Sequence, residues 1–342
     1  MPLRENVATV LLKLWYGSHP LRYLLLPLSL PFALAVVVRR VWFRLVKPAP
    51  AVSVPVIVVG NLTVGGSGKT PLVAAMAQHL KRAGHLPGII SRGYGAACCV
   101  YPRAVKDDDT AMEVGDEPLL LRHKTGCPVV IDPCRRRALE YLVECGDVNV
   151  VLSDDGLQHY RLHRDLEIAV IDGYERFGNG LLLPAGPLRE PPSRLGTVDF
   201  AVVNGGAVFE PGQFSMRMKP MWFENLKSGE RLGCDAFAGR TVHACAGIAR
   251  PQRFFDALTA LGMTVHPHAY PDHHRYHAYD LQFEAGTPVI ITEKDAIKFN
   301  REERLQADDK VWVLQAEAVL EDAFWEQFDK KMDACVPRES VI

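Results

Sequence analysis

The sequence has 342 residues, of which 48% are hydrophobic and 23% charged, and its formal net charge is −1. This length is sufficient for one large or two modest globular domains. The near-neutral charge excludes a global attraction to nucleic acid, and we expect no nucleic-acid partner. The eight cysteines show no CxxC or Cys/His spacing, which argues against a zinc site or a disulfide framework and indicates reduced cysteines.

The N-terminal segment, residues 1–50, is apolar and then basic. Residues 23–38 carry no charge, and RRVWFRLVK follows at residues 39–47. The apolar run is shorter than the ~20 residues of a spanning helix, and Pro27 and Pro31 are expected to interrupt it. Arginines stand where a signal-peptide cleavage site would lie. Two interpretations remain, a buried helical hairpin and an anchor in the membrane interface; the arginines interleaved with Trp42 favour the anchor.

A glycine-rich loop follows an apolar stretch at residues 55–70, PVIVVGNLTVGGSGKT. Glycines allow successive backbone N–H groups to point at one anion, Lys69 can reach the β- and γ-phosphates, and the Thr70 hydroxyl can bind Mg²⁺. Thr63 stands where such loops usually have their first glycine. The segment predicts an ATP site made of Thr63, Gly65, Gly66, Ser67, Gly68, Lys69 and Thr70.

Predicted strands and helices alternate after this loop. Strands are predicted at residues 54–59, 86–90, 128–131, 149–152, 166–171 and 200–203, and helices at residues 71–83, 116–125 and 135–145. Such alternation predicts an α/β fold, with a mainly parallel sheet like that of P-loop NTPases and helices on both faces. Ligands bind such sheets at the carboxyl ends of the strands.

A smaller α/β unit is predicted from residue 239 onward. Its expected elements are strands at residues 241–246, 288–292 and 310–314 and a helix at residues 252–261. We therefore expect three parts: an N-terminal membrane-associating segment (1–50), a P-loop core (51–238) and a C-terminal subdomain (239–342).

Carboxylates follow two predicted elements of the core. Asp154 and Asp155 end the apolar strand NVVLSDD, a layout typical of a Mg²⁺ site opposite a phosphate loop. Asp116 precedes a predicted helix, and its spacing leaves two interpretations open: a helix N-cap, or a carboxylate that accepts a substrate proton.

Three further motifs carry charged or titratable groups. Residues 271–277, PDHHRYH, hold three histidines that fit either a metal site or the orientation of a catalytic aspartate. The TEKD motif at residues 292–295 fits a helix N-cap as well as a base-reading turn. Arg135, Arg136 and Arg137 open a predicted helix, which fits a solvated face; because positive charge there opposes the helix dipole, it also indicates a neighbouring anion.

Seven motifs occur together in one order along the chain. They are GNLTVGGSGKTP (60–71), SRGYG (91–95), VGDEP (114–118), SDDGLQHY (153–160), PAGPLREP (184–191), PDHH (271–274) and TEKDAIK (292–298). With these seven motifs in this order, the sequence resembles the tetraacyldisaccharide 4'-kinase family. The resemblance implies transfer of the ATP γ-phosphate to the 4'-hydroxyl of tetraacyldisaccharide 1-phosphate, a step of lipid A biosynthesis, at the cytoplasmic face of the bacterial inner membrane.

The resemblance also implies roles for single residues. Asp116 and His273 would form the catalytic pair. The residues implied to bind Mg²⁺ are Thr70, Asp154, Asp155 and Glu190, and those expected to face substrate or phosphate are Tyr94, Arg135 and Arg189. Two other functions fit parts of the sequence. They are a kinase of a small soluble substrate, and a nucleotide-switched metallochaperone that uses a GGxGKT loop and the histidine cluster.

Overall fold

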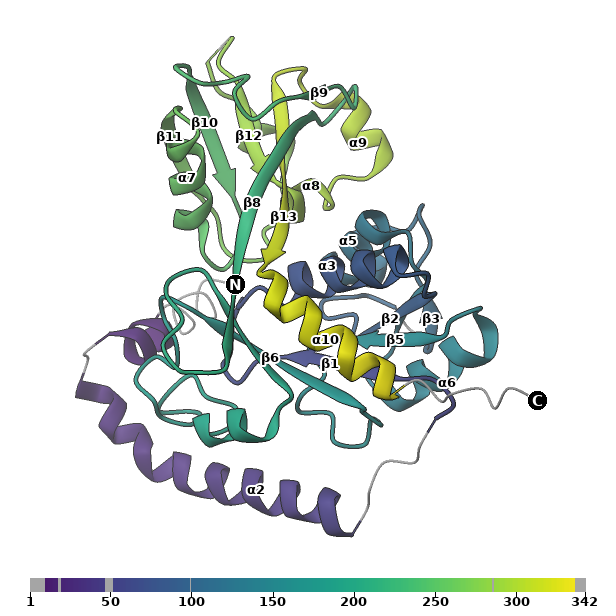
Figure 1. Ribbon diagram of the computed structural model, residues 1–342. Coiled ribbons are helices and arrows are strands. Elements are labelled where there is room, and N and C mark those ends of the chain that lie inside the picture. The colour runs from purple at the N-terminus through teal and green to yellow at the C-terminus, as the bar shows by residue number, and fades with distance from the viewer. Residues whose placement is uncertain (1–9, 18–19, 47–51, 99, 285, 336–342) are drawn as a thin grey trace.

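The structure is a computed structural model that describes residues 10–17, 20–46, 52–98, 100–284 and 286–335 (Figure 1). Parallel strands and helices alternate in the core. The core strands are β1 (Val56–Gly60), β2 (Pro87–Ser91), β4 (Val129–Ile131), β5 (Val150–Ser153), β6 (Leu166–Asp172) and β7 (Phe200–Asn204), with a short antiparallel β3 (Arg103–Ala104). The helices are α3 (Lys69–Arg82), α4 (Ala111–Val114), α5 (Asp116–Thr125), α6 (Arg135–Cys145) and the 3₁₀ helix η2 (Pro192–Thr197). Every predicted element of the core is confirmed, with boundaries shifted by at most two residues.

The core sheet is covered on both faces, as predicted. Side chains of β1 alternate between two apolar clusters because successive residues of a strand point to opposite faces. Ile57 and Val59 pack with Leu72 and Met76 of α3. On the other face, Val56 and Val58 join a cluster that includes Leu139 of α6. The carboxyl end of β1 is thereby fixed between two packed layers, and the glycine-rich loop begins there.

A C-terminal lobe, residues 226–311, extends the same sheet. Its elements are β9 (Arg231–Leu232), β10 (Thr241–Ala246), α7 (Pro251–Ala260), β11 (Thr264–Ala269), η3 (Ala278–Leu281), β12 (Val289–Thr292), α8 (Glu293–Ala296) and α9 (Arg301–Gln306). Strands β11, β10 and β12 are parallel neighbours. The predicted strands and helix of this unit are confirmed, and β11, α8 and α9 add to them.

Two long strands connect the core and the lobe. Strands β8 (Gln213–Asn225) and β13 (Val311–Leu320) are antiparallel, and Figure 1 shows them running from the core into the lobe. They complete a 13-stranded sheet of order β11-β10-β12-β13-β8-β7-β6-β1-β5-β2-β4-β3, in which β9 pairs with β8. The sequence predicted only the first part of β13 and missed β8. The predicted boundary at residue 239 therefore falls inside a continuous sheet.

Helix α10 (Asp322–Cys335) returns from β13 to the core (Figure 1). Its buried side chains Phe324, Phe328 and Met332 belong to the same apolar cluster as Leu72 of α3. The predicted C-terminal part, residues 239–342, thus contains a helix that packs on the core, and the three-part division stays a prediction.

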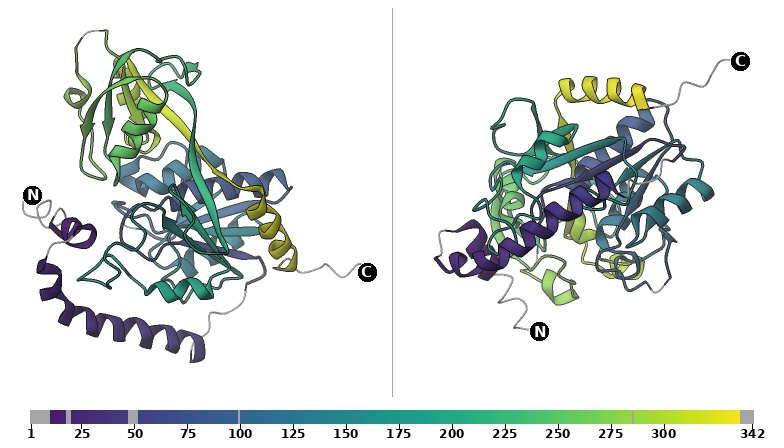
Figure 2. Two further views of the ribbon diagram at one scale, coloured as in Figure 1. Left: turned by 60° about the vertical axis from the view of Figure 1, so that its left-hand side comes forward. Right: turned by 90° about the horizontal axis from the view of Figure 1, so that it is seen from below.

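The N-terminal segment forms the 3₁₀ helix η1 (Pro20–Leu25) and one continuous helix, α2 (Leu26–Leu45). The expected interruption and the buried hairpin are wrong. Pro27 occupies the first helical turn, where a missing N–H costs nothing, and α2 continues through Pro31. Figure 2 shows α2 along the outer side of the core, away from the C-terminal lobe. Residues 1–9 and 47–50 of the predicted segment lie outside the described residues.

Most apolar side chains of α2 are exposed. They include Leu28, Leu30, Leu34, Val38 and Trp42. The buried Ser29 hydroxyl attaches the helix to the core by donating to the Leu182 carbonyl at 3.0 Å. By length and composition alone, the stretch Arg22–Leu45 is sufficient to cross a membrane, a test that core helices and signal sequences also pass.

Candidate active site

The glycine-rich loop connects β1 to α3, as the sequence predicts. Gly68 has φ 96°, which favours glycine, and a Cβ there would overlap the Asn204 side-chain amide. Asn204, at the end of β7, donates to the Ser67 carbonyl at 3.0 Å, and Asn61 donates to the Gly65 carbonyl at 3.2 Å. Two buried amides therefore hold the shape of the loop from outside. In this shape the loop can bind phosphate at the N-terminus of α3.

Thr63 and the PAGPLREP motif meet beside this loop. Thr63 and Leu188 form an isolated antiparallel bridge, and the Arg189 N–H donates to the Leu62 carbonyl at 2.7 Å. The bridge explains why a threonine occupies the position where a glycine is usual: the backbone here is extended and paired rather than tightly turned. It also places Arg189 next to the phosphate loop.

Asp154 lies at the carboxyl end of β5, facing Thr70. The Thr70 hydroxyl donates to Asp154 Oδ2 at 3.2 Å, while the buried Oδ1 has no hydrogen-bond partner. Burial and the nearby Glu117 carboxylate raise the pKa of Asp154 to about 7. An unpartnered buried carboxylate oxygen beside a threonine hydroxyl is a donor set that fits Mg²⁺, whose positive charge would relieve both the missing contact and the raised pKa.

Asp155 contacts two positively charged side chains. Lys69 Nζ is 3.7 Å from its Oδ1, and Arg189 Nη1 donates to both carboxylate oxygens at 3.2 Å. Burial alone raises the pKa of Asp155, but Lys69 and Arg189 outweigh it and lower the pKa to about 2. Asp155 also has φ 51°, a strained backbone for a non-glycine residue and one that recurs at functional sites.

The predicted catalytic pair is in contact. Asp116 is the first residue of α5 in the core, and His273 comes from a loop of the C-terminal lobe; His273 Nδ1 lies 2.9 Å from Asp116 Oδ2. Gly115 caps the helix, so the N-cap interpretation of Asp116 is wrong. His273 has φ 61°, again in the left-handed region.

Positive charge surrounds the Asp116 carboxylate. Burial raises the pKa of Asp116, but the hydrogen bond with His273 and the charge of Lys298 outweigh it, so the pKa lies below its usual value. Asp116 is therefore ionised at neutral pH. The pKa effect of Glu117 on Asp154 shows that the N-terminus of α5 lies close to the Thr70–Asp154 centre.

The other predicted site residues have different surroundings. The exposed Tyr94 ring lies 5.7 Å from the His273 ring. Arg135 is buried and donates to the Asp132 and Asp154 carbonyls, both at 3.0 Å. Glu190 is buried against Tyr160, with its Oε2 3.4 Å from Arg194 Nε. The predicted roles of these three residues stay predictions.

The histidines do not gather around one point. His274 Nε2 lies 3.1 Å from Asp280 Oδ2, and His243 Nδ1 lies 3.0 Å from His268 Nε2. Within the described ranges, no group of three or more His, Cys, Asp or Glu residues could hold a metal ion. The N-cap interpretation of TEKD is confirmed, because the Thr292 side chain accepts from the Asp295 N–H.

Two residues that shape the site are not among those predicted from the sequence. Asn204 supports the phosphate loop from the end of β7, and Lys298 places its charge near Asp116 from the turn after α8. Each had a signal: Asn204 directly follows the strand predicted at residues 200–203, and Lys298 lies four residues after Lys294, within the TEKDAIK motif.

Comparisons with known proteins identify the family of this chain. The family model described as tetraacyldisaccharide-1-P 4'-kinase matches residues 21–333. A tetraacyldisaccharide 4'-kinase of Legionella pneumophila (strain Corby) is 46% identical over 316 residues, which cover 92% of this chain and 95% of that protein. The Pseudomonas aeruginosa (strain LESB58) protein of the same name is 45% identical over 330 residues, covering 96% and 98% of the two chains.

A solved structure has the same fold. It is the crystal structure of LpxK from Aquifex aeolicus, described as an "apo" form in complex with ATP. It superposes with a TM-score of 0.75 at 29% identity and covers 91% of this chain and 99% of its own. With the matched family model and relatives above 40% identity along nearly the whole chain, this protein belongs to the tetraacyldisaccharide 4'-kinase family.

Proposed function

We propose that this kinase transfers the γ-phosphate of ATP to the 4'-hydroxyl of tetraacyldisaccharide 1-phosphate, with Asp116 as the base. The 2.9 Å contact between His273 and Asp116 carries this proposal. It connects the core, which holds the phosphate loop, to the C-terminal lobe. An ionised carboxylate held by a histidine is the group that phosphoryl transfer to an alcohol needs.

Each residue then has a defined task in the transfer. Asp116 accepts the proton of the attacking hydroxyl, and His273 holds the carboxylate in position. Lys69 and the N–H groups of the glycine-rich loop bind the phosphates, and Arg189 adds positive charge at the same edge. Mg²⁺ held by Thr70 and Asp154 would neutralise charge on the phosphates.

Helix α2, where we expect the lipid substrate to be held, is connected to the phosphate loop. Arg39 of this helix donates to the Gln158 carbonyl at 3.0 Å, and the Gln158 side chain donates to the Asn61 carbonyl at 3.0 Å, at the start of the phosphate loop. The exposed apolar side chains of α2 fit the acyl region of a bilayer. We place the enzyme on the cytoplasmic face of the inner membrane, where ATP and an acylated substrate meet.

The catalytic assignment is tested with Asp116→Asn, which keeps the shape of the side chain. The variant should lower kcat by about 10²- to 10⁴-fold, because the base is lost, while the Kd for ATP changes little. Lys69→Ala is the comparison variant and should weaken ATP binding as well. Equal losses of turnover and ATP affinity in Asp116→Asn would contradict the assignment.

The membrane assignment is tested with the double variant Leu30→Glu/Leu34→Glu, which places two charges on α2 where the side chains are 72% and 65% exposed. Its binding to vesicles of zwitterionic and anionic phospholipids should fall, because two carboxylates cannot enter the apolar layer. Leu86→Glu is the control, since Leu86 is also exposed, at 55%, but lies on the core. Unchanged vesicle binding by the double variant would refute the anchor.

A further inference from the structure

Helix α5 contacts the C-terminal lobe at both of its ends. At its N-terminal end, Asp116 meets His273, and Glu117 Oε1 lies 3.8 Å from Lys294 Nζ. At its C-terminal end, Lys124 Nζ donates to both carboxylate oxygens of Glu293 at 2.7 Å. One helix of the core is therefore held against the lobe at two points, Asp116 and Lys124, which lie about 12 Å apart along its axis.

The ion pair between Lys124 and Glu293 is largely buried. Their side chains are only 17% and 15% exposed. Lys124 also donates to the Ala316 carbonyl, so its three N–H groups are all used, and the Ala316 N–H donates to Glu293 Oε1 at 3.3 Å. Burial raises the pKa of Glu293, and the Lys124 charge opposes that rise. Each charge depends on the other, because a buried charge without a partner is strongly destabilising.

The pair lies at an irregular point of the connection between core and lobe. The register of β13 against β8 shifts between Gln315 and Ala316. The contacts of Lys124 with Glu293 and Ala316 thus join α5, α8 and β13 at this shift in register. This shift is where we expect the lobe to bend most easily relative to the core.

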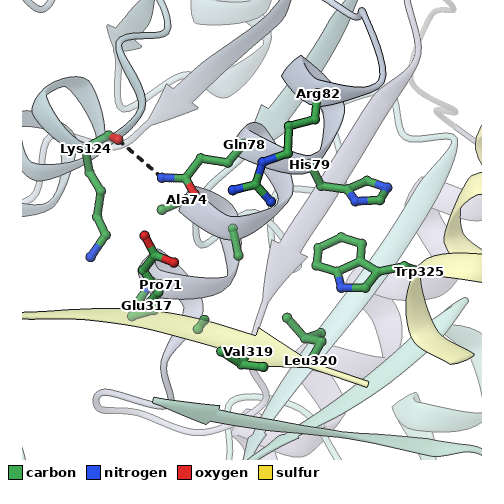
Figure 3. A pocket seen from close by; sticks show the side chains of 12 residues that line it. Pro71, Ala74, Gln78, His79, Arg82, Lys124, Glu317, Val319, Leu320 and Trp325 are labelled. Atoms are coloured by element: carbon green, nitrogen blue, oxygen red, sulfur yellow. Dashed lines mark hydrogen bonds between the residues drawn. The ribbon is translucent and has the colours of Figure 1, made fainter. Parts of the chain in front are cut away.

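A cavity lies beside Lys124. Its volume is about 190 Å³, and α3, β13 and the C-terminal end of α5 line it. Figure 3 shows Lys124 on one side of this cavity, with Val319 and Leu320 of β13 and Trp325 on the other. The Gln78 amide donates to the Lys124 carbonyl at 3.4 Å, which attaches this end of α5 to α3. Polar contacts of Lys124 therefore connect this end of α5 to both α3 and the lobe.

We propose that Lys124 and Glu293 are positioning residues for phosphoryl transfer. They hold the lobe against α5 so that His273 reaches Asp116 at the other end of the helix. Neither residue touches the reacting atoms. The inference rests on the proposed roles of Asp116 and His273, since the pair acts only through their contact.

The test is a double-mutant cycle with purified full-length protein. We would measure kcat and the KM for ATP for Lys124→Met in two backgrounds, the parent protein and His273→Ala. Arg122→Met is the matched control: Arg122 lies on the same helix, but its bidentate partner is Asp107 of the core, at 2.7 and 3.0 Å. Lys124→Met should lower kcat by about tenfold or more, because small displacements of a catalytic group are costly, with little change in the KM for ATP.

The cycle separates positioning from general damage. In the His273→Ala background, Lys124→Met should lower kcat by less than about twofold, because the contact that it positions is already lost. The same loss in both backgrounds, or a loss no larger than that of Arg122→Met, would overturn the positioning role. If His273→Ala itself retained the parent kcat, the catalytic pair would be refuted and the positioning role with it.

A second variant covers the case in which Lys124→Met does not fold because Glu293 is left unpaired. Lys124→Met/Glu293→Gln removes both charges and nearly keeps the volume, so no buried charge lacks a partner. We expect it to fold, to bind ATP and still to show the tenfold lower kcat. Parent activity in this folded double variant would overturn the proposal.

Discussion

The strictest test of the phosphate-loop geometry is Gly68→Ala compared with Gly84→Ala. The two glycines flank α3, and their φ values, +96° and +88°, both lie in the left-handed region. Alanine in that region costs about 1–2 kcal/mol at either position. The two surroundings differ: a Cβ at Gly84 meets nothing within 4 Å, whereas one at Gly68 overlaps the Asn204 amide.

The overlap at Gly68 has an additional cost. Asn204 must move, so its 3.0 Å bond to the Ser67 carbonyl is lost and a buried acceptor is left without a partner. This loss costs about 1–3 kcal/mol beyond the backbone strain. Gly68→Ala should therefore lower the free energy of unfolding by that much more than Gly84→Ala does. It should also weaken ATP binding, since each 1.4 kcal/mol that falls on the bound loop raises the Kd about tenfold.

Two measurements decide this prediction. Urea denaturation monitored by circular dichroism gives the free energy of unfolding of both variants, and titration calorimetry gives their Kd for ATP. Equal destabilisation by the two substitutions, or an ATP affinity that is the same in both, would refute the account of Gly68. If Gly84→Ala binds ATP with the Kd of the parent protein, strain at the far end of α3 does not alter the loop.

Three further predictions follow from the site and the core. His273→Ala removes the hydrogen bond that helps to hold the pKa of Asp116 below its usual value, so burial raises this pKa. Because the base acts when ionised, the acidic limb of the kcat–pH profile should move to higher pH; an unmoved limb would show that His273 does not tune the base. Asp154→Asn should raise the Mg²⁺ concentration needed for half-maximal activity, while ATP binding measured without Mg²⁺ stays close to that of the parent; an unchanged Mg²⁺ requirement would argue against Asp154 as a ligand. Phe324→Ala, in α10, should lower the free energy of unfolding by about 3–5 kcal/mol, and a loss below 1 kcal/mol in urea denaturation would mean that α10 contributes little to the core.

Features encoded by neighbouring residues were predictable from the sequence. The strand, glycine turn and helix around Lys69 follow from residue types within a few positions of each other, so this loop and the core strands were predicted correctly. The bond between Asp116 and His273 joins residues 157 positions apart, and only the family resemblance pointed to it. The spacing of Asp116 by itself also allowed an N-cap.

Features that depend on distant partners were not predictable. Strand β8 alternates polar and apolar residues from Gln213 to Lys219, a local signal of a strand, but Pro220 interrupts the pattern. Its second half belongs to the same strand because β13 pairs with it. Lys124 and Glu293 are 169 positions apart, and neither carries a local signal of its partner. Pro31 indicated a break in the N-terminal helix, yet α2 continues through it. For β8, pairing with a strand distant in sequence outweighs the local effect of Pro220.

The position of α10 has a consequence for how the chain folds during synthesis. Domains usually fold in the order in which the ribosome releases them. Here Phe324, Phe328 and Met332 complete the apolar cluster that begins with Ile57, and the whole lobe between Leu226 and Val311 is translated before them. A nascent chain released only as far as the lobe therefore exposes the apolar side chains that α10 covers, among them Phe200 and Phe214. Until α10 is synthesised and covers these side chains, they form an exposed hydrophobic surface of the kind that chaperones bind.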